Sequence, residues 1–172
     1  MRYLPALLAA VLVVCLVSPA TAQEEPTPGP EYKALDYFLG EWTYAFSGET
    51  EGTGELNMRT FGDGYFVHWH ETWREASVAP VEIVGWIGYD GEGKHYTWAR
   101  FWSNGYSDTG KGWKHGDTWV FVMDESYEEG KLIRWRTTWT VMSPESWEIT
   151  WERSVEGQPW ELTGRGKATK AD

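Results

Sequence analysis

The chain has 172 residues, of which 15 are Lys or Arg and 26 are Asp or Glu, so its formal net charge is −11. This acidity argues against nucleic-acid binding, which depends on Lys and Arg to neutralise phosphates. Aromatic residues make up 16% of the sequence and include 13 Trp. That content excludes a disordered chain, and the length predicts one globular domain.

Residues 1–22 have the pattern of a secretory signal peptide. A basic start precedes an apolar run over residues 4–17, and Ala20 and Ala22 form an Ala-x-Ala cleavage site. About 14 apolar residues are too few to cross the ~30 Å hydrocarbon layer of a membrane. We therefore expect cleavage before Gln23 and a periplasmic or secreted protein with no integral membrane segment after removal of the signal.

The one cysteine, Cys15, lies within this predicted signal. Cleavage would leave 150 of the 172 residues, with 14 basic side chains (the original 15 without Arg2), 26 acidic ones and a net charge of −12. Without a thiol, we expect no disulfide and no cysteine-based site. The predicted organisation is a tether and helix start over residues 23–34, followed by one barrel domain over residues 35–172.

The first predicted element is a short helix over residues 31–39. Prolines in the preceding residues 23–30 (QEEPTPGP) predict a flexible tether. Leu35 and Phe38 fall on one face of the helix, and Gly40 is placed to end it.

Beyond this helix, apolar and polar residues alternate in short segments, which indicates β-strands. Turns rich in Gly, Asn, Asp and Pro separate them, so consecutive strands should be antiparallel neighbours. Closure of such a meander into a barrel hides its edges. The predicted fold class is therefore all-β, an antiparallel up-and-down barrel of about ten strands with one short N-terminal helix. The predicted strands are 41–46, 54–60, 65–74, 81–89, 95–102, 106–113, 118–123, 131–139, 146–154 and 160–167.

The Trp positions predict the registers of three hairpins, because a one-residue shift sends an indole to the opposite face of a sheet. The predicted turn centres lie near Glu92, Tyr127 and Ser143. The resulting pairs are Trp86 with Trp98, Trp119 with Trp135, and Trp139 with Trp147. An inner apolar face is expected to continue through Trp151, Trp160 and Leu162. The sequence leaves open whether these side chains fill the barrel or line a hollow.

Gly40-Glu41-Trp42 opens the first predicted strand. This Gly-x-Trp resembles the signature of lipocalins and the wider calycin barrels. The resemblance implies that Trp42 closes the barrel base beneath a basic residue of the last strand. Arg165, or Lys167 on the same face, is the expected partner.

Residues 35–168 also resemble a bacterial domain-of-unknown-function family, number fifteen seventy-nine, which has a calycin-like barrel. The matching segments are LDYFLGEW, EGTGEL, GDGYF, GWIGYDGEGKHYTWARFWSNG and DTW. The family has no established activity, so the resemblance implies a fold and no function. Haem-binding barrels of the nitrobindin type are similar but bind iron through a C-terminal His. This chain has no His beyond His115, so haem is not expected, and no cofactor is predicted.

His68 and His70 are separated by one residue in a predicted strand, which places both imidazoles on one face. Two such imidazoles can bind Zn²⁺ if His95 or a neighbouring carboxylate completes the ligand set. Glu71 lies on the opposite face by parity. The alternative is a pair of histidines on a solvent-facing strand.

Trp98, Arg100 and Trp102 share one face of another predicted strand. A guanidinium between indoles is stabilised by cation–π contacts. If this face lines a cavity, Arg100 would hold an anionic head group and the indoles an apolar body. The complete set of cavity candidates is Trp42, His68, His70, Trp98, Arg100 and Trp102.

The function we expect is binding of a small apolar or amphiphilic molecule in an aromatic cavity. A metal-assisted or His-dependent enzyme on the same barrel is an alternative, although no catalytic constellation stands out and no catalytic residue is predicted. A carbohydrate-stacking surface of outward Trp is another. A small outer-membrane barrel is a fourth, disfavoured because the strands and loops are short.

Overall fold

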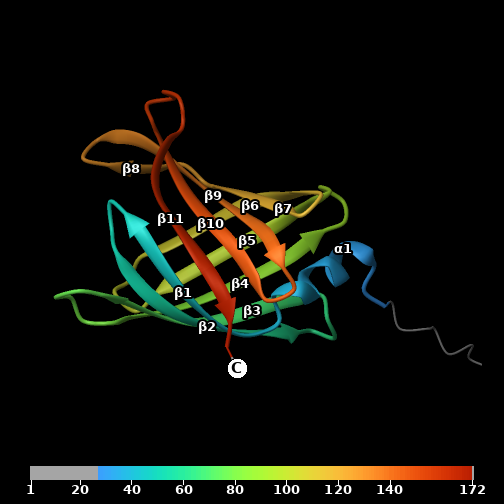
Figure 1. Ribbon diagram of the computed structural model, residues 1–172. Coiled ribbons are helices and arrows are strands. Elements are labelled where there is room, and N and C mark those ends of the chain that lie inside the picture. The colour runs from blue at the N-terminus through green and yellow to red at the C-terminus, as the bar shows by residue number, and fades with distance from the viewer. Residues whose placement is uncertain (1–26, 172) are drawn as a thin grey trace, which may run out of the picture.

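The computed structural model describes residues 27–171, so the predicted signal peptide and the first part of the tether lie outside the described residues. The chain forms a β-barrel with a short helical segment at one end (Figure 1). No helix within residues 27–171 is long and apolar enough to span a membrane.

The predicted N-terminal helix is present as two short pieces. An α-helical turn, α1 (Pro30–Lys33), leads directly into a 3₁₀ segment, η1 (Ala34–Phe38). Leu35 and Phe38 are buried, as expected from their common face. The segment ends at Gly40, whose φ of +117° suits a residue without a Cβ.

Eleven strands follow, ten of which form the barrel wall. Each of the ten predicted segments corresponds to one of these ten strands. The strand bounds are β1 (Gly40–Gly48), β2 (Gly52–Phe61), β3 (Phe66–Glu75), β4 (Val81–Asp90), β5 (His95–Trp102), β6 (Ser107–His115), β7 (Thr118–Met123), β8 (Ser126–Glu128), β9 (Lys131–Ser143), β10 (Ser146–Val155) and β11 (Glu161–Lys170).

The strands are antiparallel to their neighbours, and the last strand, β11, pairs with both β10 and β1 to close the barrel. This confirms the predicted fold class. The extra strand, β8, is only three residues long and pairs with the start of β9. It forms an arm beside one end of the barrel (Figure 1), and it was not among the strands predicted from the sequence.

The predicted register of the β4–β5 hairpin is wrong by one residue. Trp98 lies opposite Ile87, and Trp86 lies opposite Ala99. The turn contains an even number of residues, because four residues separate Asp90 and His95, the last paired residues of this hairpin. This parity puts Trp98 inside the barrel and Trp86 on its outer face.

Two other predicted registers are wrong by an even number of residues, which preserves the faces. Trp119 lies opposite Trp139 because the β8 arm lengthens the connection between β7 and β9. Ile149 lies opposite Trp139 because the β9–β10 register shifts near the turn. Trp147 consequently still points inward and is 1% exposed.

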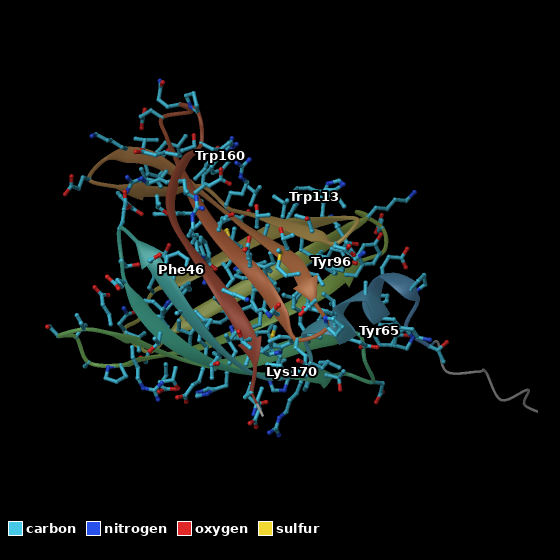
Figure 2. The ribbon with its side chains drawn as sticks, in the orientation of Figure 1. Phe46, Tyr65, Tyr96, Trp113, Trp160 and Lys170 are labelled. Atoms are coloured by element: carbon cyan, nitrogen blue, oxygen red, sulfur yellow. The ribbon has the colours of Figure 1, made fainter. Side chains whose placement is uncertain are left out.

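The end of the inner face was predicted wrongly. Leu162 is 46% exposed and lies opposite Glu152, beside the register shift that follows Trp151. Trp160 lies at the barrel end that carries the β8 arm (Figure 2). The guanidinium of Arg136 is 4.5 Å from its ring. The bulge therefore turns this part of the chain away from the core.

One end of the barrel is filled by aromatic side chains. Phe38, from η1, is fully buried and makes edge-to-face contacts with Trp119, Trp139 and Trp147, with centroids 4.9, 5.1 and 5.4 Å away. Trp42 donates a hydrogen bond of 2.8 Å from Nε1 to the Phe38 carbonyl oxygen. The helical segment thus closes the barrel at this end.

The basic residue over Trp42 is Lys170, which corrects the expectation of Arg165 or Lys167. Lys170 lies opposite Trp42 in the β1–β11 pairing, with its Nζ 5.5 Å from the indole centroid. Arg165 and Lys167 are an odd number of residues from Lys170, so they face outward, and both are exposed.

Candidate functional site: an aromatic cavity at the open end

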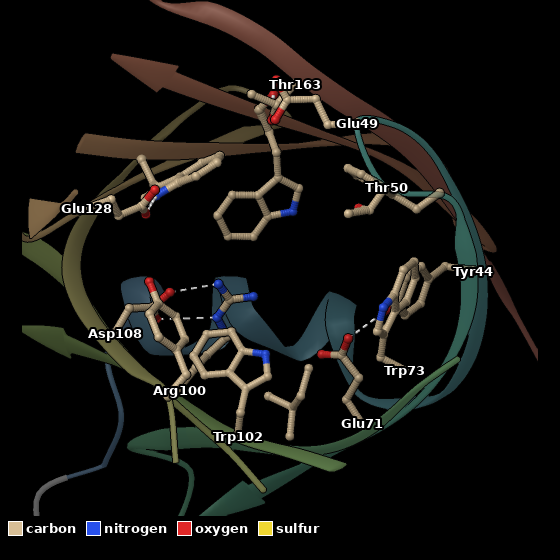
Figure 3. Close-up of a pocket in the computed structure, with 15 residues that line it drawn as sticks. Tyr44, Glu49, Thr50, Glu71, Trp73, Arg100, Trp102, Asp108, Glu128 and Thr163 are labelled. Carbon is tan, nitrogen blue, oxygen red and sulfur yellow. Dashed lines mark hydrogen bonds and ion pairs between the residues drawn. The ribbon is translucent and has the colours of Figure 1, made fainter. Parts of the chain in front are cut away.

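A cavity of about 450 Å³ lies inside the barrel, and the helical segment is seen behind it, at the far end of the barrel (Figure 3). Inward-facing residues of β1, β3 and β5 supply much of its wall, since alternate residues of a strand share a face. Figure 3 shows the side chains converging on a central space. The lining residues are Tyr44, Phe46, Glu49, Thr50, Glu71, Trp73, Ile83, Arg100, Trp102, Tyr106, Asp108, Glu128, Trp135, Trp151 and Thr163.

A smaller hollow of about 50 Å³ continues toward the core. It shares part of the wall of the larger cavity and is bordered by Leu56, Trp69, Trp98 and Trp139. The barrel is therefore packed at one end and hollow at the other.

Arg100 lies on one wall of this cavity with its positive charge paired. Its Nη2 is 2.7 Å from Asp108 Oδ2, and its Nε donates to Oδ1 at 3.3 Å. Asp108 Oδ1 also accepts a hydrogen bond of 2.8 Å from Trp98 Nε1. Both side chains of the ion pair are about nine-tenths buried, with exposures of 12% and 11%. The pair is therefore a fixed and electrically neutral part of the wall.

Three indoles surround the Arg100 guanidinium. Its central carbon is 5.0, 4.3 and 4.6 Å from the ring centroids of Trp98, Trp102 and Trp151. Contacts of this kind each contribute about 0.5–2 kcal/mol. The side of the guanidinium away from Asp108 faces the cavity centre (Figure 3).

Glu71 is a carboxylic acid on the wall across from Arg100. It is 8% exposed and accepts a hydrogen bond from the Tyr44 hydroxyl. Tyr44 in turn stacks on Trp73, with centroids 5.7 Å apart and planes 12° apart. Apolar residues flank Glu71 in the sheet, Leu56 on one side and Ile83 on the other.

Burial raises the pKa of Glu71, and the Tyr44 hydrogen bond and the charge of Arg100 only partly oppose this effect. Burial also raises the pKa of Tyr44, with a further contribution from the neighbouring Glu71. A buried carboxyl in an aromatic pocket favours its neutral form. Glu71 therefore keeps its proton to a higher pH than an exposed carboxyl does.

The rim adds two further carboxylates. Glu49 forms an ion pair with Arg153 at 3.0 Å. Glu128, from the β8 arm, accepts a hydrogen bond of 3.4 Å from Trp135 Nε1.

The structure brings together part of the predicted site and separates the rest. Arg100 and Trp102 line the cavity, and Trp98 borders the smaller hollow. Trp42 lies at the closed end and lines neither space.

His68 and His70 are on the outer face of β3, so the expectation that they line the cavity is corrected. Val67, Trp69 and Glu71 occupy the inward positions of this strand, and parity directs the two histidines outward. The His68 ring lies 5.2 Å from Trp86. His70 Nε2 is 3.0 Å from Glu82. Within residues 27–171 no group of three or more His, Cys, Asp or Glu is arranged to hold a metal ion.

Sequence reasoning missed Glu71, Tyr44, Trp73 and Asp108 as cavity residues. The sequence did contain an indication for Glu71, because Glu71 shares a strand face with Trp69 and Trp73. Parity also places it on the face opposite the two histidines. Tyr44 likewise follows Trp42 at an interval of two. Asp108 carried no such signal, because a polar residue in a glycine-containing strand is normally solvated.

No protein-family model matches the chain, and no curated protein matches it. The resemblance to family number fifteen seventy-nine therefore stays a prediction. Solved structures with a similar fold include the following two. Rv2717c from M. tuberculosis is 13% identical, with a TM-score of 0.56 over 84% of this chain and 99% of that one. The S-type phycobiliprotein lyase CPES from Guillardia theta is 9% identical, with a TM-score of 0.55 over 81% and 92%. At these identities the likeness concerns the fold alone: the chain has a calycin-like β-barrel.

Proposed function

We propose that this protein binds a small apolar or amphiphilic molecule in the cavity at the open end of its barrel. The observation that carries the proposal is the cavity itself, about 450 Å³ of space walled mainly by aromatic side chains and a few polar groups. Small-molecule sites are typically concave and apolar, with few polar groups that orient the ligand. The fold class agrees with this use, since barrels of this size can enclose one small ligand.

The predicted signal at residues 1–22 adds a location to this proposal, the periplasm or the exterior of the cell. Cell fractionation and N-terminal sequencing of the mature protein test this part, with an expected start at Gln23. A cytoplasmic protein that retains its first 22 residues would contradict it.

Native mass spectrometry of the protein purified from its own host is the first test of binding. We expect an additional organic mass of a few hundred daltons that is lost on denaturation. A defined probe, 2-naphthalenemethanol, allows the same question to be asked by calorimetry, because it is flat, neutral and small enough for the cavity.

Matched tryptophan variants locate the site of that probe. Trp102→Leu removes a cavity wall, and Trp86→Leu removes an indole from the outer face. We expect Trp102→Leu to weaken binding by roughly tenfold, consistent with the loss of one aromatic contact, and Trp86→Leu to leave it unchanged. Equal affinity in both variants would place the ligand elsewhere.

A further inference from the structure

The charges around the cavity are unequal. Five lining residues carry ionisable charge, namely Arg100, Glu49, Glu71, Asp108 and Glu128. The one cation is paired with Asp108 at 2.7 Å. Glu49 is paired with Arg153, just outside the lining, at 3.0 Å.

Two acids then remain without a basic partner. Among residues 27–171 no ion pair involves Glu71 or Glu128. In its ionised form each of these two acids adds a negative charge to the cavity that no ion pair neutralises, in a chain whose net charge is already −11. Such a field raises the local concentration of cations and lowers that of anions.

The aromatic walls of the cavity also favour a positively charged ligand. Indole and phenol rings carry negative charge on their faces and attract cations. Arg100 demonstrates this on one wall, where three indole rings lie within 5.0 Å of its guanidinium carbon. On the facing wall Trp73 stacks on Tyr44, and no Lys or Arg of residues 27–171 stacks on Trp73.

We infer that the cavity selects an organic cation, a flat or apolar body that carries an ammonium or similar charge, and holds that charge beside Glu71 and Trp73. This inference rests on the proposed function and names its ligand class. It replaces the expectation that Arg100 holds an anionic head group, because Asp108 already neutralises Arg100. Figure 3 shows Glu71 and Trp73 on the same side of the cavity, across from Asp108.

Binding of such a cation should be coupled to the release of a proton. A positive charge near Glu71 stabilises its carboxylate form, whereas burial in the free protein raises the pKa of this group. Affinity for a cation of fixed charge should therefore rise with pH. Tyr44 from β1 and Arg100 from β5 act on Glu71 from other strands, and Trp69 and His70 act on it from its own strand.

Three probes with the same 2-naphthylmethyl body test this selection by calorimetry: (2-naphthylmethyl)trimethylammonium, 2-naphthalenemethanol and 2-naphthaleneacetate. They share one flat body and differ in charge. We expect the cation to bind roughly tenfold more tightly than the neutral probe near pH 8, a difference typical of one charged contact in a half-buried site. The anion should bind most weakly.

Two variants that each remove one charge from the cavity, and one control variant, separate the contributions of Glu71 and Asp108 to the selection of charge. Glu71→Gln should abolish most of the advantage of the cation and flatten the rise of its affinity with pH, because the variant has no carboxyl group to ionise at this position. Asp108→Asn should strengthen binding of 2-naphthaleneacetate, because it leaves Arg100 uncompensated. Glu82→Gln removes one negative charge from the outer face, where Glu82 pairs with His70, and should change none of these affinities.

The results of these experiments distinguish the inference about the ligand's charge from the proposed binding function on which it rests. If the neutral probe binds in the cavity and the cation binds no better, the charge selection is wrong and the binding function stands. If the anion binds most tightly to the unaltered protein, Arg100 is the anchor and the inference is overturned. If none of the three probes binds, both the inference and the proposed function are contradicted. If Glu71→Gln does not fold, binding of the three probes to the unaltered protein and to Asp108→Asn still decides whether the cavity selects a cation.

Discussion

The two ends of this barrel contain the same kind of side chain in opposite arrangements. At the closed end Trp42 and Trp147 are each 1% exposed and pack around Phe38. At the open end Trp73 and Trp102 face a space of about 450 Å³. The difference is caused by the helical segment, which inserts Phe38 at one end, whereas no corresponding element of residues 27–171 fills the other end. Tryptophan alone therefore does not decide whether such a barrel is packed or hollow.

The two ends also differ in polarity. The closed end is held by aromatic packing, and the indole nitrogens of Trp119 and Trp147 have no hydrogen-bond partner within the described part of the chain. The open end contains a buried ion pair and a buried acid. Aromatic packing should therefore contribute to stability mainly at the closed end, and the choice of ligand should depend on the open end.

Removal of Phe38 should produce the largest loss of stability. Phe38→Ala leaves a cavity among three indoles, and truncations of this kind cost about 3–5 kcal/mol. Tyr106→Ala is the matched change at the open end, where Tyr106 is 47% exposed, and should cost less than about 1 kcal/mol. Guanidinium unfolding followed by Trp emission measures both. Equal losses would contradict the division between the two ends.

Breaking the buried ion pair should have the next largest effect. Arg100→Met leaves Asp108 charged and nearly buried, which costs about 3 kcal/mol. The double variant Arg100→Met/Asp108→Leu removes both charges and should recover at least half of that loss. Thermal unfolding of the two variants is the measurement. A double variant less stable than Arg100→Met would show that the pair stabilises the fold through more than charge compensation.

The pH dependence of stability isolates Glu71. Burial raises its pKa above the ordinary value of 4.5, so the folded chain holds this proton more firmly than the unfolded chain. Glu71 therefore contributes its full stabilisation of the folded state below about pH 4.5. This stabilisation is lost as the pH rises through the pKa of Glu71 in the folded state. Glu71→Gln removes it, so the variant should gain stability relative to the unaltered protein as the pH rises. A difference between the two that does not change with pH would contradict the raised pKa.

Loss of the cation–π contact at the closed end should have the smallest effect on stability. Lys170→Met removes the ammonium group above Trp42 and should cost about 0.5–1 kcal/mol, the value of an exposed cation–π contact. Lys167→Met makes the same change on the outward face and should cost less. Chemical unfolding at low and high salt compares them. A larger loss in Lys167→Met would support the basic residue expected from the sequence.

Alternation within strands was sufficient to predict the closed antiparallel barrel, the inward face of β9 and β10, and the common face of Arg100 and Trp102. It failed where the number of residues in a turn decides parity, as between Asp90 and His95, and where a bulge follows Trp151. Turn length and bulges depend on contacts with other strands, which a single segment does not contain.

The polar part of the cavity was harder to predict for a related reason. Asp108 lies inside because Arg100 and Trp98, from the neighbouring strand, bind its carboxylate. Glu71 is buried with the help of Tyr44, which is 27 residues away. Such pairs form across strands, so local patterns show the position of each residue but not its partner.

The indole N–H signals in a two-dimensional NMR spectrum report directly on whether a ligand enters the cavity at the open end. Single Trp→Phe substitutions assign the signals, and 2-naphthalenemethanol is then titrated into the protein. We expect shifts at Trp73, Trp102, Trp135 and Trp151, which line the open end, with little change at Trp42, Trp119 and Trp147. Shifts confined to the outward indoles Trp86 and Trp113, or to the closed end, would contradict a binding site in this cavity.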